Sequence, residues 1–147
     1  MGLHACASEK DIPNIVFILV DDMGYGDLGC MGCQDIATPN IDRLATQGLR
    51  LNHCYVTNSI CTPSRAAILT GTYNHVNCVT TLTTPISNRL PNVAKHLQNS
   101  GYQTAIIGKW HLGGHNVKAL QPAAHGFDEV PWCKDAGGSA YFTKGSK

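Results

Sequence analysis

The sequence predicts an α/β fold, in which a mostly parallel sheet is flanked by helices. Two observations predict it. Short apolar runs of strand length alternate along the chain with segments that carry helix start and stop signals. The apolar run "IVFILV" at 15–20 is also continuous rather than alternating, which is typical of a strand covered on both faces. Such strands occur mainly in sheets that lie between layers of helices.

Three segments are predicted as strands. The first, "NIVFILVDD" at 14–22, ends in two acidic residues. The second is "LRLNHCYV" at 49–56, and the third is "YQTAIIG" at 102–108. The Gly- and Pro-rich sequence that follows the third strand predicts no further regular element.

The segments between these strands predict helices. "TPNIDRLATQG" at 38–48 begins with Thr-Pro and ends with Gly, as many helices do. "TPSRAAILTG" at 62–71 repeats this pattern, with Thr62 as the expected N-cap and Pro63 at the first helical position. A third helix is predicted within 90–101, whereas the Thr- and Asn-rich segment 72–89 predicts irregular structure.

Length and composition limit the possible classes of protein. The chain has 147 residues, the size of one domain or of a piece of a larger one, and a net charge of +1. This charge, without a basic patch, does not indicate a nucleic-acid partner. The longest apolar run, 15–20, is too short to span a bilayer. Residues 1–11 lack the apolar region of a complete signal peptide and are expected to form a flexible N-terminus.

Polar side chains from three segments are expected at one edge of the sheet. Asp21 and Asp22 follow the first strand, and Lys109 and His111 follow the third. Cys61 lies where a helix is expected to begin. Because ligands bind beyond the carboxyl ends of parallel strands, these residues predict one site.

Each part of this site has a functional and an ordinary interpretation. Asp21 and Asp22 suit Ca²⁺ or Mg²⁺, or they are a solvated turn. Cys61 and Arg65 suit an anion at a helix N-terminus, or they are a buried cysteine and a surface arginine. The three residues between Cys61 and Arg65 are too few for a cysteine-dependent phosphatase loop, which has five.

Lys109 and His111 alternate along "GKWH", so in an extended chain they would point the same way. A lysine can bind an anion and a histidine can transfer a proton. This pair alone is weak evidence for a site.

Several segments together resemble the type I sulfatases. "CTPSRAAILTG" at 61–71 is similar to the C-x-P-S-R signature of that family. Four other segments resemble family segments in the expected order, and the resemblance covers roughly 12–130: "DDMGYGDLGC", "TPNIDRLATQG", "GKWHLG" and "HGFDE". The resemblance implies an alkaline phosphatase-like α/β fold.

The resemblance also implies a mechanism. In the family, a formylglycine-generating enzyme oxidises the signature cysteine, here Cys61, to an aldehyde. One hydroxyl of its hydrate attacks the sulfur of the substrate, and the other later helps to expel sulfate. Asp21 and Asp22 would bind Ca²⁺ or Mg²⁺ together with the matured Cys61. Arg65 would hold the formylglycine side chain.

The resemblance implies the remaining roles in this mechanism for two residues that follow the third predicted strand. Lys109 would bind sulfate, and His111 would contact the second hydroxyl of the hydrate and help its deprotonation. Sulfated carbohydrates are the expected substrates, and the periplasm or the extracellular space is the expected location.

Members of this family are several times longer than this chain. Residues 12–147 are therefore expected to be the N-terminal portion of a sulfatase catalytic domain, inactive by itself because the later metal and substrate ligands lie outside it. Two alternatives remain open. One is a phosphonate or phosphate ester hydrolase of the same superfamily, and the other is a truncated product without catalytic activity.

Overall fold

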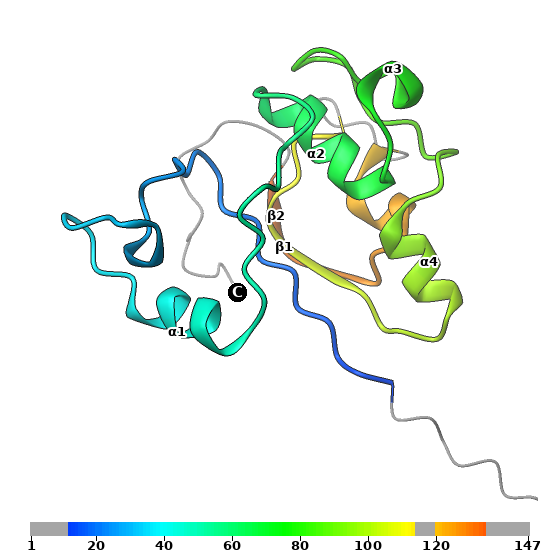
Figure 1. Cartoon of the computed structure of the whole chain (residues 1–147). Helices are drawn as coiled ribbons and strands as arrows, with labels where there is room; N and C mark the ends of the chain where they lie inside the picture. Colours follow the sequence, from blue (N-terminus) through cyan, green and yellow to red (C-terminus); the bar gives the residue numbers. More distant parts are fainter. Residues whose placement is uncertain (1–11, 114–119, 135–147) are drawn as a thin grey trace, which may run out of the picture. The chain divides into compact units, whose positions relative to one another are not determined.

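The computed structural model describes residues 12–113 and 120–134 in two compact units (Figure 1). The first unit extends to residue 50, and the second begins at residue 51. The expected flexible segment 1–11 lies outside the described residues. Of the helices within the described ranges, none is long and apolar enough to cross a membrane.

The first unit contains helix α1, Pro39–Gln47, and the short 3-10 helix η1, Gly29–Met31. Helix α1 confirms the prediction for 38–48. It starts with a proline, whose missing N–H is not needed there. It ends at Gly48, whose N–H donates to the carbonyl of Leu44 at 2.9 Å.

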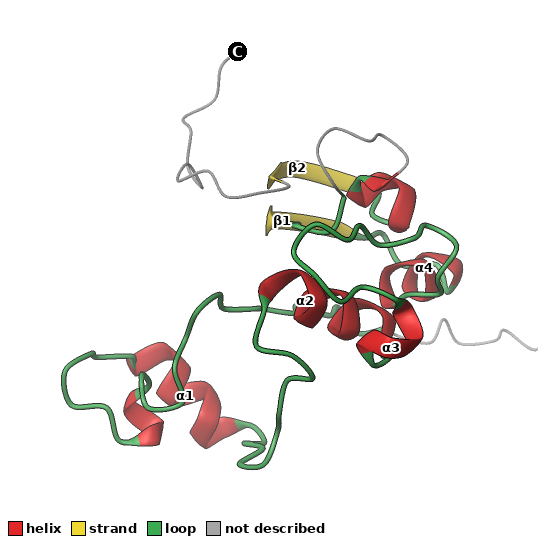
Figure 2. Ribbon diagram, turned by 90° about the horizontal axis from the view of Figure 1, so that it is seen from above, coloured by secondary structure: helices red, strands yellow, loops and turns green. Residues whose placement is uncertain are grey.

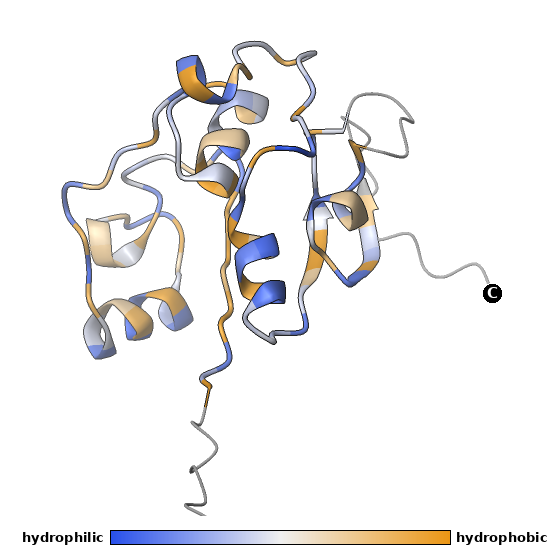
Figure 3. Cartoon of the chain, turned by 90° about the vertical axis from the view of Figure 1, so that its right-hand side faces the viewer, coloured by the Kyte–Doolittle hydropathy of each residue, from blue (hydrophilic) through white to orange (hydrophobic). Residues whose placement is uncertain are grey.

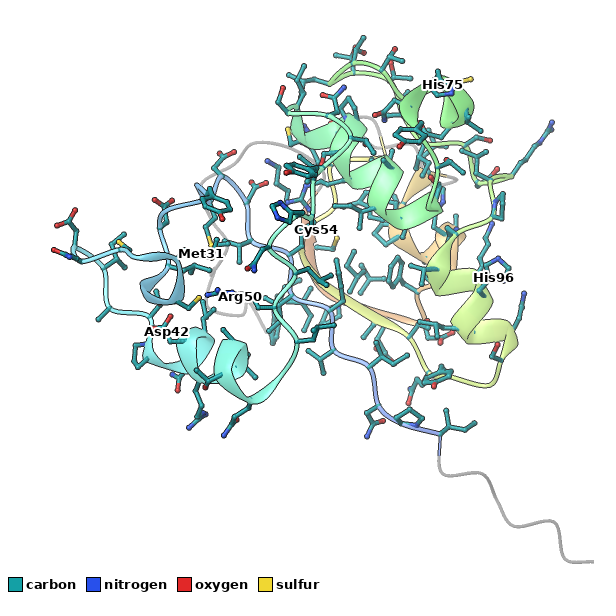
Figure 4. All side chains as sticks on the ribbon, viewed as in Figure 1. Met31, Asp42, Arg50, Cys54, His75 and His96 are labelled. Carbon is teal, nitrogen blue, oxygen red and sulfur yellow. The ribbon has the colours of Figure 1, made fainter. Side chains whose placement is uncertain are left out.

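Hydrogen bonds tie η1 to α1. The Asp42 carboxylate accepts from the backbone N–H of Cys30 at 2.7 Å and from the Thr38 hydroxyl at 3.0 Å. The Thr38 hydroxyl in turn accepts from the N–H of Gly29 at 2.8 Å, so the side chain of this N-cap residue binds the loop and makes no capping bond to α1. Arg50 donates to the carbonyl of Cys30 at 2.7 Å (Figure 4, which labels Asp42 and Arg50).

The predicted strand at 14–22 is wrong for this structure. The segment has no regular secondary structure, and its apolar side chains are exposed, with 82% of Val16 and 71% of Phe17 accessible to solvent. In Figure 3 the apolar residues of this segment, which follows the grey N-terminal trace, are coloured orange. A strand needs a neighbouring strand for its backbone hydrogen bonds, and within the described residues this segment has none. The predicted strand at 49–56 is wrong for the same reason.

The second unit contains the remaining elements (Figure 2). In chain order they are α2, Cys61–Thr70; α3, Asn74–Asn77; α4, Val93–Asn99; β1, Ala105–Lys109; η3, Pro122–His125; and β2, Glu129–Lys134. Helix α2 contacts both α3 and α4.

Strands β1 and β2 form a two-stranded parallel sheet. Strand β1 confirms the prediction for 102–108, although it begins and ends later. The pairing Ala105–Glu129 shifts by one residue before the pairing Ile107–Trp132, which indicates a bulge. The sequence analysis missed β2, which contains a proline at its third residue. A proline is tolerated in an edge strand because its missing N–H can face away from the partner.

The second and third predicted helices are confirmed with different starts. Helix α2 begins at Cys61 after Ile60, so Thr62 is not its N-cap and Pro63 is its third residue. The first turn tolerates a proline at any of these positions, because its first N–H groups have no partner within the helix. Gly71 ends α2 with a φ of 65°, as predicted. Helix α4 is capped by the Asn92 side chain, which accepts from the N–H of Lys95 at 3.0 Å.

The core of the second unit lies between α2 and one face of the sheet. Its buried members are Ala66, Leu69, Val79, Ile86, Trp110 and Leu112, with Ile106 and Phe127 packed against them. Ile107 and its partner Trp132 are 67% and 66% exposed on the other face. The core therefore packs α2, the signature helix that contains the C-x-P-S-R sequence, against the residues that follow β1.

Candidate active site

Cys61 is the first residue of α2, and its half-buried thiol is not in a disulfide. The two residues that follow it, Thr62 and Pro63, are buried. The Thr62 hydroxyl donates to the carbonyl of Leu82 at 3.3 Å. Buried neighbours therefore fix Cys61 at a helix N-terminus, where unpaired N–H groups favour an anion.

Arg65 lies one turn further along α2 and connects the helix to the sheet. Its Nη1 donates to the carbonyl of Lys109 at 2.7 Å, although 44 residues separate them in the sequence. The guanidinium is a rigid, planar donor, so this bond restricts its orientation as well as its position. The structure thus brings together two of the predicted site segments, the one that begins at Cys61 and the one that ends β1.

Lys109 is the last residue of β1, and His111 follows the strand. His111 has a φ of 58°, in the left-handed region that non-glycine residues seldom adopt. The alternation that predicted a common direction for Lys109 and His111 applies only to an extended chain, so it does not extend to His111. Trp110, between them, is only 2% exposed and belongs to the core.

Trp110 is held on three sides. Its ring lies 5.3 Å from the ring of His125 and 6.0 Å from that of Phe127, the second contact being edge-to-face. Its indole N–H donates to the carbonyl of Leu120 at 3.1 Å. His125 and Phe127 belong to the "HGFDE" segment, so that segment packs directly behind the "GKWH" segment.

His125 is completely buried, and neither of its ring nitrogens has a hydrogen-bond partner in the part of the chain that the structure describes. Burial first of all, together with the positive charge of Lys95, lowers the pKa of His125 from 6.5 to about 4. His125 is therefore neutral at physiological pH. The sequence analysis assigned it no role of its own, because nothing in the sequence predicts that a histidine will be buried without partners.

Asp128 holds the residue that precedes β1 through several hydrogen bonds. Its carboxylate accepts from the backbone N–H of Thr104 at 2.9 Å, from the Gln98 side chain at 2.6 Å and from the Thr104 hydroxyl at 2.9 Å. These hydrogen bonds, first of all that from the Thr104 backbone, hold the pKa of Asp128 below its usual value.

Asn74 supports the signature helix and was also missed. Its side-chain amide donates to the carbonyl of Pro63 at 2.7 Å and to that of Val79 at 2.9 Å. Sequence analysis predicted only irregular structure around this residue. The one available signal was its position three residues after the Gly71 helix stop, where the chain must turn back along α2.

Asp21 and Asp22 lie in the first unit and are exposed. Asp22 has a φ of 55°, again in the left-handed region. Carboxylate oxygens are the donors that Ca²⁺ and Mg²⁺ prefer, so the type of donor fits a hard cation. The number does not fill the shell, since no group of three or more potential ligands occurs within the described residues. That the two carboxylates join Cys61 at one site stays a prediction.

A sequence model of the family described as Sulfatase matches residues 13–147, nearly the whole chain. The chain belongs to the sulfatase family. The match includes every residue predicted for the site, from Asp21 to His111.

Curated relatives show how much of a sulfatase this chain represents. An N-acetylglucosamine-6-O-sulfatase of Bacteroides thetaiotaomicron is 42% identical over 116 residues, which cover 76% of this chain and 21% of the relative. Human arylsulfatase A is 45% identical over 134 residues, which cover 85% of this chain and 26% of the relative. This sulfatase-family chain therefore spans about a quarter or less of the curated relatives that it matches here.

A solved structure supports the fold. A protein in complex with its substrate, D-glucosamine-2-N,6-O-disulfate, is similar to this chain with a TM-score of 0.71 and 42% identity. The similarity covers 80% of this chain and 22% of that protein. The predicted α/β fold with a parallel sheet is confirmed as the N-terminal part of the alkaline phosphatase-like sulfatase fold.

Proposed function

We propose that this chain is the N-terminal portion of an enzyme that hydrolyses sulfate esters, with the matured Cys61 side chain as its nucleophile. One observation carries the proposal. The hydrogen bond from Arg65 to the Lys109 carbonyl joins the sulfatase signature to the segment that holds the expected sulfate ligands. A core of buried apolar residues behind this bond keeps both segments in place.

Each of these residues has a distinct task in the proposed reaction. A maturation enzyme oxidises Cys61 to formylglycine. One hydroxyl of its hydrate would attack sulfur while the S–O bond to the departing alcohol breaks, and loss of the proton of the second hydroxyl would then expel sulfate and re-form the aldehyde. Arg65 orients the side chain at position 61. The Lys109 ammonium binds sulfate oxygens, and His111 accepts the proton of the second hydroxyl.

Asp21 and Asp22 are the proposed ligands of Ca²⁺, or of Mg²⁺, together with the matured Cys61. Such an ion supplies charge neutralisation at sulfate oxygens. Two aspartates provide few of the six to eight oxygen ligands that Ca²⁺ takes. For this reason we propose that the 147-residue chain alone does not turn over sulfate esters.

Sulfated carbohydrates are the proposed substrates. Support comes from the relatives, one named for a sulfated amino sugar and one solved with a sulfated glucosamine. A phosphonate or phosphate ester hydrolase is the alternative that the experiment must separate.

Peptide mass spectrometry tests the proposed nucleophile. The protein that contains this chain within a complete catalytic domain would be co-expressed with a formylglycine-generating enzyme. Trypsin should release residues 51–65, a peptide that contains both Cys61 and Cys54. We expect an aldehyde at Cys61, reactive toward an aminooxy probe, and an unchanged thiol at Cys54. An unmodified Cys61 in fully active enzyme contradicts the proposal.

Activity measurements test the reaction. We expect turnover of an aryl sulfate well above that of an aryl phosphonate, and the reverse order would favour the alternative. Cys61→Ala should remove the aldehyde and the activity together. Cys61→Ser should be inactive too, because a serine hydroxyl can attack sulfur but lacks the second hydroxyl needed for release. Cys54→Ala is the matched control and should keep both the aldehyde and the activity.

A further inference from the structure

Trp110 is a buried core residue that lies directly between two residues of the proposed site. Its backbone lies between Lys109 and His111, while its side chain is 2% exposed and points into the core of the second unit. Because Trp110 is bonded through its backbone to both neighbours, the packing of its indole ring restrains where their backbone lies. The ring is held by the Leu120 carbonyl and by the rings of Phe127 and His125.

Among the residues that contact the Trp110 ring, His125 is unusual, because its polar imidazole is buried where an apolar side chain would be expected. It is completely buried, it stacks at a tilt of 49° on Trp110, and its nitrogens have no partner among the described residues. A buried imidazole without hydrogen bonds costs free energy that an apolar residue would not.

The backbone around His125 is fixed as well. Gly126 has a φ of 91°, and a Cβ added there would lie 2.7 Å from the backbone nitrogen of Lys95 in α4. Pro122, at the start of η3, is buried. The backbone on both sides of His125 therefore packs closely against the rest of the second unit.

We propose that His125 is a positioning residue of the sulfatase site, whose buried ring packs on the Trp110 side chain and through it holds Lys109 and His111 in place. The inference rests on the proposed roles of Lys109 and His111. It assigns His125 no contact with substrate.

The strained backbone conformation of His111 needs support from the residues packed around it. A left-handed conformation at a non-glycine residue is costly, and it persists only where the surrounding structure fixes it. The bond from Arg65 to the Lys109 carbonyl holds the segment on one side of Trp110. The bond from the Ile86 N–H to the Leu112 carbonyl, at 2.9 Å, holds it on the other. Misplacement of reacting groups by about 1 Å can cost about 100-fold in rate.

The surroundings keep the imidazole neutral. The charged group that acts on it from α4 is Lys95, whose positive charge disfavours a second one. Asp128, from its own segment, is occupied by Thr104 and Gln98. The face toward β1 is covered by Trp110. A proton on His125 would find no acceptor among the described residues, so the ring would have to leave the core and would release Trp110.

The fluorescence of Trp110 tests this coupling without any assay of activity. The sequence has two tryptophans, and Trp132→Phe leaves Trp110 alone. In the complete protein with this change, we expect Trp110 emission to change in a transition centred near pH 4, where His125 gains its proton. The same protein with His125→Leu, which cannot gain a proton, should lack that transition, with circular dichroism recorded to separate it from global unfolding. An unaltered transition in His125→Leu overturns the inference.

Hydrogen exchange and kinetics test the consequence for the site. His125→Ala should increase amide exchange across 109–113 and lower kcat/KM for an aryl sulfate by about tenfold or more. His125→Phe, which restores a ring that is never charged, should recover most of both. His96→Ala, at an exposed histidine of α4, is the matched control and should change neither (Figure 4 labels His96). Wild-type exchange and wild-type kcat/KM in His125→Ala overturn the inference.

Two further outcomes remain decisive. If His125→Ala does not fold, the fluorescence of the Trp132→Phe protein and the His125→Phe kinetics decide the matter. If Lys109→Ala and His111→Ala both keep full sulfatase activity, the proposed function is wrong in its roles for these residues. In that case an unchanged exchange of 109–113 in His125→Ala would show separately that His125 does not hold the segment.

Discussion

The two units of this chain are held together by different interactions. In the second unit, from residue 51, buried apolar side chains from α2, β1 and the connecting segments form a core. In the described part of the first unit, residues 12–50, no residue is buried, and hydrogen bonds that Asp42 and Thr38 accept from backbone N–H groups hold the loop to α1. Two parts of one proposed site therefore depend on different amounts of local structure.

The proposed nucleophile and the proposed metal ligands lie in these two different surroundings. Cys61 and Lys109 lie in elements that pack on the core of their own unit. Asp21 and Asp22 follow an exposed segment without regular structure. We therefore expect substitutions in the second unit to change stability, and substitutions of the two aspartates to change activity with little effect on stability.

Removal of a proposed metal ligand should have the largest effect. In the complete, matured protein, Asp22→Asn should lower kcat/KM for an aryl sulfate by about 1,000-fold or more, because a bound metal ion contributes several kcal/mol of charge stabilisation. Asparagine tolerates the left-handed φ of this residue, so the stability of the 147-residue chain should change by less than about 0.5 kcal/mol. Full activity with a full metal content in Asp22→Asn would show that Asp22 is part of an ordinary solvated turn.

Loss of a core aromatic residue should show the largest difference in stability between the two units. In the 147-residue chain, Trp110→Ala should lower the free energy of unfolding by about 3–5 kcal/mol, the usual cost for a large buried aromatic side chain. Phe17→Ala in the first unit, where 71% of the side chain is exposed, should cost less than about 0.5 kcal/mol. Urea unfolding measures both. Equal costs would mean that the two units do not differ in the way described.

Acid should destabilise the second unit through His125. The native pKa of about 4 is below the unfolded value of 6.5, so the folded state binds fewer protons than the unfolded state between these values. Stability should therefore fall as the pH drops from 6.5 to about 4, by at most about 3 kcal/mol, and this contribution should level off at lower pH. The free energy of unfolding of wild type and of His125→Leu, measured against pH, would show the effect. A wild-type curve parallel to that of His125→Leu would rule it out.

The smallest effect concerns the hydrogen bonds of the first unit. Asp42→Ala removes the acceptor of the Cys30 N–H and of the Thr38 hydroxyl. The substitution should increase amide exchange across 28–33. It should also lower the free energy of unfolding of the first unit by about 1–2 kcal/mol, if that unit unfolds cooperatively. Asp35→Ala, at an exposed aspartate of the same unit, is the matched control. If both variants exchange alike, the loop is held by other contacts.

Local patterns in the sequence predicted the helices well. The Thr-Pro starts and glycine stops located both ends of α1 and the end of α2, and they placed the start of α2 two residues too late. The error at the start of α2 has a simple cause, because a proline fits any position of the first turn and Pro63 therefore cannot specify which one it occupies.

Strands were harder to predict, because a strand depends on residues far away in the sequence. Residues 14–22 have the composition of a buried strand, but they lack a partner in the described part of the chain. Strand β2 lacks a clear pattern, yet it pairs with β1. The supporting residues were missed for the same reason, since the contacts of Asn74 with Pro63 and of His125 with Trp110 exist only in the folded unit.

The exposed apolar segment at 15–20 has a consequence for the behaviour of the chain at high concentration. Its six consecutive residues are branched, aliphatic or aromatic, contain no proline or charge, and are 42–82% exposed. Segments of this composition add to one another edge to edge and stack into cross-β fibrils when nothing covers them. Asp21 and Asp22 follow directly, and their repelling charges work against such stacking. The two proposed metal ligands would thus also act as gatekeepers against aggregation, and a cation that neutralised them without a completed fold would promote it.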